Sequence, residues 1–158
     1  MKYGFNEKGF SLIEILVTIS IIAIVLAIAV PTYFGYIRAS KTTEAKTNLQ
    51  ALGLLLEQRR SDSGTYCPAT ATNYTYTEND AGAVTAETIR IVGGVNYLIN
   101  FRPKLATTGA AVLYDYTVNC PAAGNNLTFT ITAAPAAGRG APTGNLTLTE
   151  TGAKTGWQ

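Results

Sequence analysis

An apolar stretch near the N-terminus constrains this chain more than any other feature. Residues 10–30 read FSLIEILVTISIIAIVLAIAV, and Glu14 is the only charged residue among these 21. At about 1.5 Å per residue, a helix of this length spans roughly 31 Å, which matches the hydrocarbon thickness of a bilayer. A helix that is apolar on every side is buried on every side. The stretch is therefore predicted to cross a membrane or to be surrounded by other helices.

The composition excludes several classes of enzyme. The 158 residues contain no histidine, which removes Ser-His-Asp and Cys-His catalysis and histidine-ligated zinc. The two cysteines, Cys67 and Cys120, do not form a CxxC pair and are too few for a thiolate zinc site. The formal net charge is only +2, which does not favour electrostatic binding to nucleic acid. We expect a structural or membrane-linked protein that is not an enzyme and needs no metal and no cofactor.

A secretory signal peptide is the main alternative explanation of the apolar stretch. Signal peptides have apolar regions of about 7–15 residues, followed by a cleavage site of small residues. Here the apolar run is longer and leads into Pro31, which disfavours cleavage after it. Lys2 and Lys8 precede the run, and the positive-inside rule places that end in the cytoplasm. The C-terminal part of the chain is then expected outside the cytoplasm.

The residues around Gly9 carry a specific motif. Residues 8–14 read KGFSLIE, and together with the apolar stretch and Pro31 they resemble the class III leader and N-terminus of the type IV pilins. The resemblance implies that residues 1–9 are a leader, that a prepilin peptidase cuts after Gly9, and that the new N-terminus, Phe10, is methylated. Residues 10–30 would then stay in the mature protein as a membrane-spanning helix that later forms the filament core.

The same resemblance implies the partners and the location of the chain. The partners are other pilin subunits, the prepilin peptidase, an inner-membrane assembly platform and, before assembly, the inner membrane itself. The chain would cross that membrane once and then enter an extracellular pilus. The sequence does not distinguish a major from a minor subunit, nor adhesion from twitching, DNA uptake or electron transfer.

Glu14 and Pro31 occupy the positions that matter for assembly in this family. A carboxylate at the bilayer centre costs roughly 2.5–3.5 kcal/mol on insertion scales, so it needs a partner or must stay neutral. The resemblance implies that Glu14 pairs with the N-terminal amine of Phe10 on a neighbouring subunit and so sets the register of the filament. The alternative is that Glu14 lies near the interface and extends to water without a partner. Pro31 removes one helical hydrogen bond, which weakens the helix where filament packing could use a bend.

Residues 31–63 are predicted to continue the helix with one apolar face. That face repeats at helical spacing and consists of Ala45, Leu49, Leu52 and Leu56. Gly53 suggests the close approach of another backbone, and Gly64 after Ser63 is a helix stop.

The C-terminal half alternates between apolar and polar residues, as strands do. Four strands are predicted, at 95–101, 112–118, 127–133 and 146–148, with turns at 106–109, 121–125 and 135–144. We expect an α+β fold in which this four-stranded antiparallel sheet, within a head of residues 95–158, packs its apolar face on the helix, while residues 64–94 form an irregular αβ-loop. This order resembles a pilin head, and residues 127–135 and 145–157 resemble the minor pilins of the PilE type.

The two cysteines have a role in this arrangement. Outside the cytoplasm a disulfide is permitted, and Cys67–Cys120 would join the segment after the helix to the end of a core strand. Pilins with both cysteines in the C-terminal region bound a surface loop with their disulfide, and that loop is not expected here.

Two related functions and one unrelated one remain as alternatives. A type II secretion pseudopilin is disfavoured because the last 40 residues hold a single acid, Glu150, where a calcium site would need several. A DNA-uptake pilin would need a basic patch, for which the candidates are Arg59, Arg60, Arg90, Arg102, Lys104, Arg139 and Lys154. Ordinary solvated surface charge is the favoured explanation of these residues. A membrane-anchored enzyme is remote, because the chain has neither histidine nor clustered carboxylates.

Overall fold

The computed structural model describes residues 9–68, 73–79, 82–92, 95–103, 112–121 and 127–157. The chain divides into two compact units, residues 1–37 and residues 38–158, and each is described by itself. Helix α1 (Leu12–Ser63) supplies the regular structure of the first unit and the only α-helix described in the second. The predicted leader lies mostly outside the described part, which begins at residue 9. Lys104, the predicted turn at 106–109 and most of the predicted turn at 121–125 also lie outside it.

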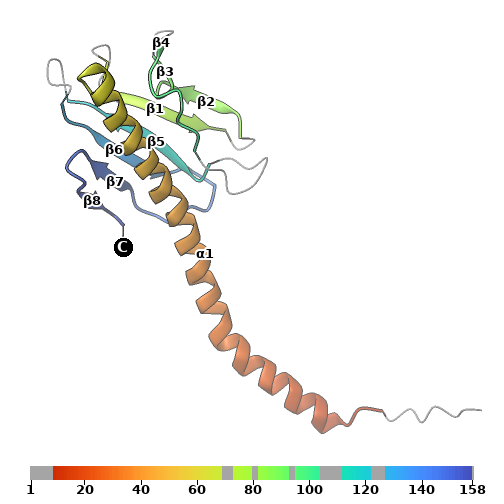
Figure 1. The fold of residues 1–158 in the computed structure, drawn as a ribbon. Helices are drawn as coiled ribbons and strands as arrows, with labels where there is room; N and C mark the ends of the chain where they lie inside the picture. Colours follow the sequence, from red (N-terminus) through yellow and green to blue (C-terminus); the bar gives the residue numbers. More distant parts are fainter. Residues whose placement is uncertain are drawn as a thin grey trace, which may run out of the picture. The chain divides into compact units, whose positions relative to one another are not determined.

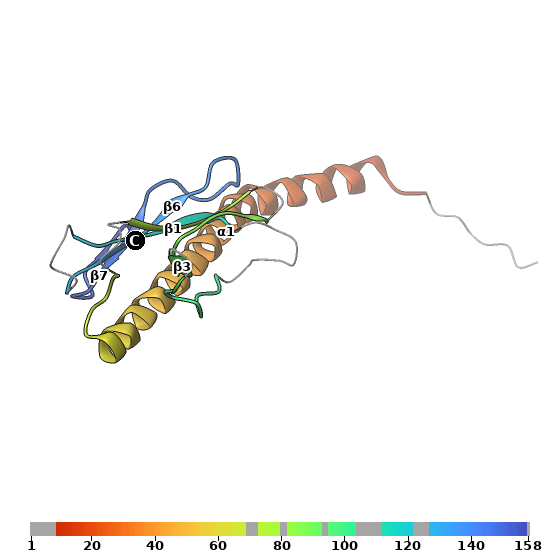
Figure 2. The same cartoon turned by 90° about the horizontal axis from the view of Figure 1, so that it is seen from above.

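The second unit packs α1 against an antiparallel sheet, which confirms the predicted α+β class (Figure 1). The sheet has six strands in the order β2-β1-β5-β6-β7-β8, and β3 and β4 form a separate hairpin. The strands are β1 (Asn73–Glu78), β2 (Val84–Glu87), β3 (Ile91–Val92), β4 (Val95–Asn96), β5 (Tyr114–Asn119), β6 (Thr130–Pro135), β7 (Leu146–Thr149) and β8 (Lys154–Thr155). Viewed from above, the C-terminal half of α1 and the sheet form two layers (Figure 2).

The predicted helix face is the one that the sheet covers. Ala45, Leu49, Leu52 and Leu56 are each fully buried, and Asn48 joins them on the same face. On the sheet side, the inward residues of neighbouring strands lie opposite one another, and they include Tyr74, Tyr76, Tyr114, Tyr116, Val118, Ile131, Ala133, Leu146 and Leu148. This shared core determines which side of α1 meets the sheet.

Gly53 allows close contact, although not with a backbone as predicted. A Cβ at Gly53 would lie 3.2 Å from Cδ2 of Leu148, a side chain of β7. Gly64 ends the helix as predicted, with a φ of +77° and its amide donating to the Arg60 carbonyl at 2.8 Å. A positive φ of this size favours glycine over any residue with a Cβ.

The strand prediction was wrong at its N-terminal end. Residues 95–101 were expected as one strand, but only Val95–Asn96 is extended, and the chain then turns with Phe101 N donating to Leu98 O at 2.9 Å. The alternation of apolar residues is satisfied differently, because both Tyr97 and Leu98 are buried by this turn. Conversely, residues 64–94 are not an irregular loop, since they contain β1, β2 and β3. The other three predicted strands correspond to β5, β6 and β7, and β8 was not predicted.

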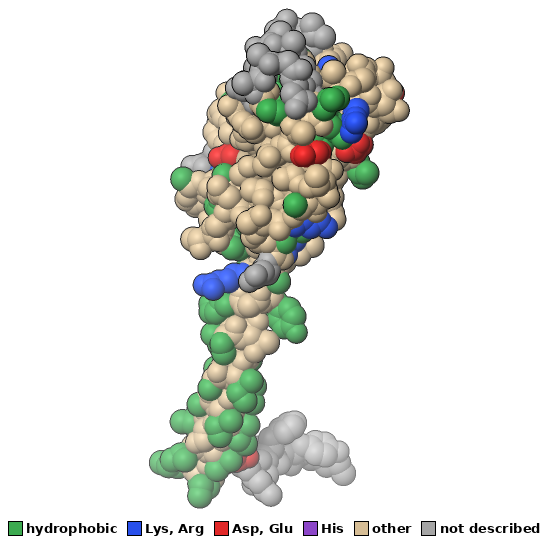
Figure 3. Space-filling view, turned by 90° about the vertical axis from the view of Figure 1, so that its left-hand side faces the viewer, with side chains coloured by type: hydrophobic (Ala, Val, Ile, Leu, Met, Phe, Trp, Pro, Cys, Tyr) green, Lys and Arg blue, Asp and Glu red, His purple; other side chains and the backbone are tan. Residues whose placement is uncertain are grey.

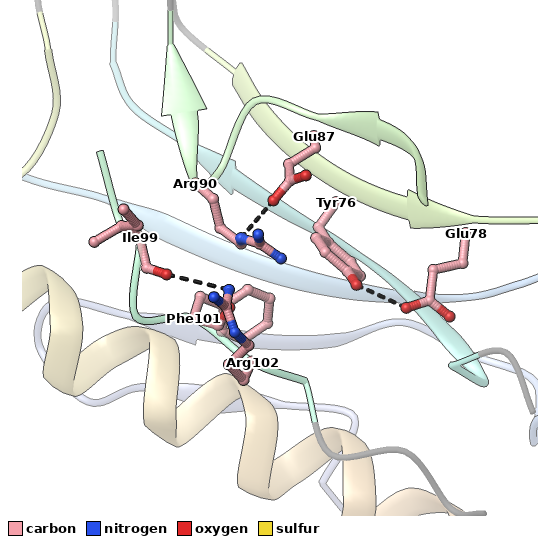
Figure 4. A network of polar contacts seen from close by, with 7 residues as sticks. All are labelled: Tyr76, Glu78, Glu87, Arg90, Ile99, Phe101 and Arg102. Atoms are coloured by element: carbon pink, nitrogen blue, oxygen red, sulfur yellow. Dashed lines mark hydrogen bonds and ion pairs between the residues drawn. The ribbon is translucent and has the colours of Figure 1, made fainter. Parts of the chain in front are cut away.

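Among the residues that the structure describes, two polar side chains are buried in this core, those of Asn48 and Glu78, and both are hydrogen-bonded. Asn48 donates to the Tyr116 hydroxyl at 2.7 Å. Glu78 accepts from the Tyr76 hydroxyl at 2.7 Å, a bond visible in Figure 4, and from the backbone amide of Val112 at 2.8 Å. Buried polar groups with partners fix one arrangement, because any other would leave them unsatisfied.

Candidate functional site

The first unit presents an apolar surface that no described part of the chain covers. The large apolar side chains from Phe10 to Val30 are between 45% and 83% exposed. Their helix includes a window of mean hydropathy 2.9 with none of its residues buried, so it is long and apolar enough to cross a membrane. Hydrophobic side chains cover the visible surface of this segment in Figure 3. An apolar surface of this extent requires lipid or other protein against it.

The polar side chains inside this apolar segment differ in how they are satisfied. The Thr18 hydroxyl donates to the Ile15 carbonyl at 2.8 Å, and the Ser20 hydroxyl donates to the Leu16 carbonyl at 2.7 Å. Such bonds to the preceding turn allow a hydroxyl to lie in an apolar environment. Glu14 is exposed, and no described residue pairs or hydrogen-bonds with its carboxylate. Glu14 is therefore the one carboxylate of residues 10–30, and it has no partner among the residues that the structure describes.

The predicted processing site lies just before the helix. Gly9 and Phe10 have no regular secondary structure, and α1 begins at Leu12. The Ser11 carbonyl accepts the first helical bonds, from the amides of Glu14 at 3.0 Å and Ile15 at 3.3 Å. Because these bonds begin at Ser11, the Gly9–Phe10 bond is outside the helical hydrogen-bond network, and Phe10 is 78% exposed.

Pro31 lies inside α1, which continues helically through it. Proline has no amide hydrogen, so the carbonyl four residues earlier loses its usual donor. The next residue, Thr32, donates its hydroxyl to the Ile28 carbonyl at 2.9 Å. A helix that keeps its form across a proline has one weaker position rather than a break.

The disulfide between Cys67 and Cys120 is present, in agreement with the prediction. Their Cα atoms are 6.4 Å apart, and both residues are buried. The Tyr97 hydroxyl lies 3.5 Å from the sulfur of Cys67 and donates to the Tyr66 carbonyl at 3.0 Å. Burial raises the pKa of Tyr97 well above its usual value, with a smaller opposing effect from Arg59. The bridge thus lies buried in the core beside the side chain of Tyr97.

Most of the described arginines of the predicted basic patch are engaged within the chain. Four of them bind groups of their own chain. Arg60 donates to the Tyr66 hydroxyl at 2.8 Å, and Arg90 pairs with Glu87 at 2.5 Å. Arg102 donates to the Ile99 and Phe101 carbonyls, each at 3.3 Å, and Arg139 donates to the carbonyls of Val112 and Glu78. Figure 4 shows the Arg90 and Arg102 contacts. Lys154 lies over the Trp157 ring at 4.6 Å.

A metal centre has no support in the described part of the chain. Within residues 9–68, 73–79, 82–92, 95–103, 112–121 and 127–157, no group of three or more His, Cys, Asp or Glu side chains could hold an ion. Glu150, the one acid of the last 40 residues, lies at the end of β7, with Oε2 3.4 Å from the amide of Phe129.

Sequence reasoning missed three features of the second unit. Asn48 follows Ala45 and precedes Leu49 on the same helix face, so its helical spacing could have placed it in the core. Glu78 continues the inward alternation of Tyr74 and Tyr76, but a carboxylate is not expected in a core from its type alone. The cavity beside Arg59 has no sequence signal, because the turn that closes it was predicted as a strand.

The comparisons with known proteins find similarity in a limited segment of the chain, which includes the apolar residues 10–30. A family model described as the prokaryotic N-terminal methylation motif matches residues 4–30. The type IV major pilin protein PilA of Myxococcus xanthus (strain DK1622) is 43% identical over 51 residues, which are 32% of this chain and 23% of that protein. The type IV major alpha-pilin of Moraxella bovis is 49% identical over 45 residues, 28% of each chain. A fimbrial protein of Pseudomonas aeruginosa is 41% identical over 46 residues, 29% of this chain and 30% of that protein.

These matches are partial. The chain spans only about a quarter to a third of the length of these curated relatives. No solved structure matches. The similarity therefore concerns a segment, and the rest of the chain is interpreted from its own structure.

Proposed function

We propose that this chain, which has the N-terminal segment of the type IV pilin family, is a structural subunit of a type IV pilus. The methylation motif, the relatives named as pilins and fimbrial proteins, and the long apolar helix with an antiparallel sheet all support this function. One observation carries the proposal: the apolar surface of residues 10–30 is exposed and contains a single unpaired carboxylate, that of Glu14.

Before assembly, the apolar segment would lie in the inner membrane as a single-pass helix. Lys2 and Lys8 support a cytoplasmic N-terminus, which leaves the head outside. An oxidising compartment on that side agrees with the buried disulfide between Cys67 and Cys120.

Processing would occur at the bond between Gly9 and Phe10. A peptidase binds its substrate in an extended form, and this bond lies outside the helix. Cleavage converts the amide nitrogen of Phe10 into an amine, which is the cation that Glu14 lacks. The cut would therefore create the positive charge that assembly requires. An uncut chain has an amide at Phe10 and would be unable to form the pair.

In the filament, the apolar segments of neighbouring subunits would cover one another in place of lipid. Glu14 of one subunit would pair with the Phe10 amine of another, which removes two buried charges only in the correct register. Such a pair specifies position more than it adds stability. The weakened position at Pro31 would allow the helix to adjust to its neighbours.

The described residues favour neither alternative function over this one. Four arginines of the basic patch that DNA uptake would require are bound within the chain. A pseudopilin with a C-terminal calcium site would need more acids than Glu150 alone.

Mass spectrometry of filaments sheared from the cell surface tests the proposal. The expected result is an abundant chain that begins at methylated Phe10 and contains the Cys67–Cys120 disulfide. A chain that begins downstream of residue 30, or that is found only in the membrane fraction, would refute it.

A further inference from the structure

The end of α1 forms one wall of a small cleft that the pilus function does not use. The last two turns of the helix and the turn at Tyr97–Asn100 enclose a volume of about 170 Å³. Arg59 and Asp62 line the helix side, and Tyr97 and Asn100 line the opposite side. The cleft therefore combines a cation, an anion, an aromatic ring and an amide.

Arg59 is held in this cleft by a ring rather than by hydrogen bonds. Its guanidinium carbon lies 4.9 Å from the centre of the Tyr97 ring. The Tyr97 ring is itself fixed, because it is buried and its hydroxyl donates to the Tyr66 carbonyl. Arg59 is half-buried, its Nε is fully covered, and no described residue accepts a hydrogen bond from it.

This distinguishes Arg59 from the other four described arginines of the predicted basic patch. Arg60, Arg90, Arg102 and Arg139 all donate to acceptors of their own chain. A guanidinium ordered over an aromatic ring, with the donors of its two terminal nitrogens unused, is prepared to bind a carboxylate end-on through two parallel hydrogen bonds.

The second charge in the cleft stays available as well. Asp62 is one turn from Arg59, yet the two side chains do not form an ion pair with each other, and Asp62 has no partner among the described residues. The last carbonyls of α1, near Asp62, add partial negative charge at this end of the helix. One wall thus offers separate sites for a negative and a positive group.

We propose that this cleft binds a small zwitterion of the α-amino acid type. Arg59 receives its carboxylate, and Asp62 with the helix end receives its ammonium group. The amide of Asn100 offers a further donor and acceptor at the opposite wall. A divalent anion such as phosphate suits the cleft less well, because Asp62 and the helix end repel it.

The test is a titration of the full chain in detergent micelles with glycine, followed by NMR of the arginine Nε–Hε signals. The signal of Arg59 is identified by its loss in Arg59→Lys. The expected result is a saturable shift of Arg59 and of the amides of residues 97–100. Acetate and methylammonium, which each carry only one of the two charges, are expected to bind at least tenfold more weakly, and phosphate is expected to bind no more tightly than acetate. Sodium chloride at matched ionic strength is expected to give no saturable shift.

Matched variants separate a built site from a general charge effect. Arg59→Gln and Asp62→Asn should each weaken glycine binding at least tenfold, with the other amide signals unchanged as evidence of an intact fold. Arg38→Gln removes an exposed arginine of the same helix that does not line the cleft, and it should leave binding unchanged. Equal binding of acetate and glycine, tighter binding of phosphate, an unsaturable shift, or full binding by Arg59→Gln would each overturn the proposal. Filament assembly does not enter this test, so its outcome is independent of the proposed function.

Discussion

At the scale of single residues, Glu14 differs from Thr18 and Ser20, the hydrogen-bonded polar residues of the same apolar segment, because its side chain has no partner among the described residues. Thr18 and Ser20 satisfy their hydroxyls within the helix, and a carboxylate has no comparable way to do so. An acid in an apolar environment without a partner is costly, which is why such residues are usually functional. The chemistry of the segment therefore points to an interaction with a second molecule.

Replacing Glu14 tests that interaction. Glu14→Ala removes a charge that is unfavourable in lipid, so the variant should insert into the membrane at least as well as the parent. The variant should also lose the carboxylate that is proposed to set the register between subunits. The yield of filaments sheared from the cells should therefore fall at least tenfold. Thr18→Val, a change in the same segment, serves as the control and should assemble normally. Normal filament yield from Glu14→Ala would contradict the assigned role.

A second residue links the structure to pH. Asp115 lies on β5, and its Oδ1 is buried without a hydrogen-bond partner. Burial raises the pKa of this carboxyl above 3.8, the Glu78 carboxylate raises it further, and Arg139 opposes the shift. A raised pKa means that the folded state favours the protonated acid. Stability from this group is therefore complete below pH 3.8 and is lost as pH rises through the raised value.

Asp115→Asn should remove the loss of folding stability that accompanies ionisation of this carboxyl. The variant is expected to be more stable than the parent at pH 7, and the difference should shrink as pH falls towards 3.8. Denaturant unfolding of both proteins from pH 3 to 7 measures this difference directly. A difference that is constant with pH, or that grows in acid, would show that the charge of Asp115 is not disfavoured in the folded state.

At the scale of elements, the buried face of α1 is what joins helix to sheet. Leu52 is fully buried in the shared core, whereas Leu54, two residues later, is 72% exposed. Leu52→Ala should lower the free energy of unfolding by about 2–5 kcal/mol, because it removes buried methyl groups and leaves a cavity. Leu54→Ala is the matched control and should change it by less than about 1 kcal/mol. Equal effects from the two variants in denaturant unfolding would mean that the helix does not pack as described.

The sequence predicts an element well where the spacing of its apolar residues is compatible with a single type of secondary structure. The helical spacing of Ala45, Leu49, Leu52 and Leu56 has no alternative, and the structure buries all four. Alternation is less decisive, since Tyr97 and Phe101 satisfy it in a turn, while Tyr74 and Tyr76 satisfy it in a strand. The difference depends on pairing partners, because β1 pairs with β5 from Asn73↔Asn119 to Tyr76↔Tyr116. Such long-range pairing cannot be read from a local pattern.

The same limit applies to the sites. A linear motif is complete in the sequence, so Gly9, Phe10 and Glu14 could be identified without a structure. The cleft at Arg59 depends on a turn from a distant segment, and therefore only the fold reveals it.

At the scale of the whole molecule, the disulfide closes a long loop through the head. Cys67 and Cys120 are 53 residues apart, and the bridge joins the segment after α1 to the end of β5. In the chain-entropy model, a bridge over such a loop stabilises the folded state by about 4 kcal/mol. The double variant Cys67→Ser, Cys120→Ser should therefore unfold at a markedly lower midpoint concentration of denaturant than the oxidised parent. A midpoint equal to that of the oxidised parent would show that the bridge adds nothing to stability.

The central claim is that Glu14 of one copy meets the Phe10 amine of another. Solid-state NMR of filaments grown from a mixture of two labelled pools tests this most directly, with ¹⁵N-phenylalanine in one pool and ¹³C-glutamate in the other. Of the five phenylalanines, only Phe10 would carry a terminal amine, so its nitrogen signal is distinct. The account predicts magnetisation transfer between that amine and the Glu14 carboxyl carbon in mixed filaments, and its loss in Glu14→Ala copies admitted into parent filaments. Well-ordered mixed filaments without this intermolecular transfer would contradict it.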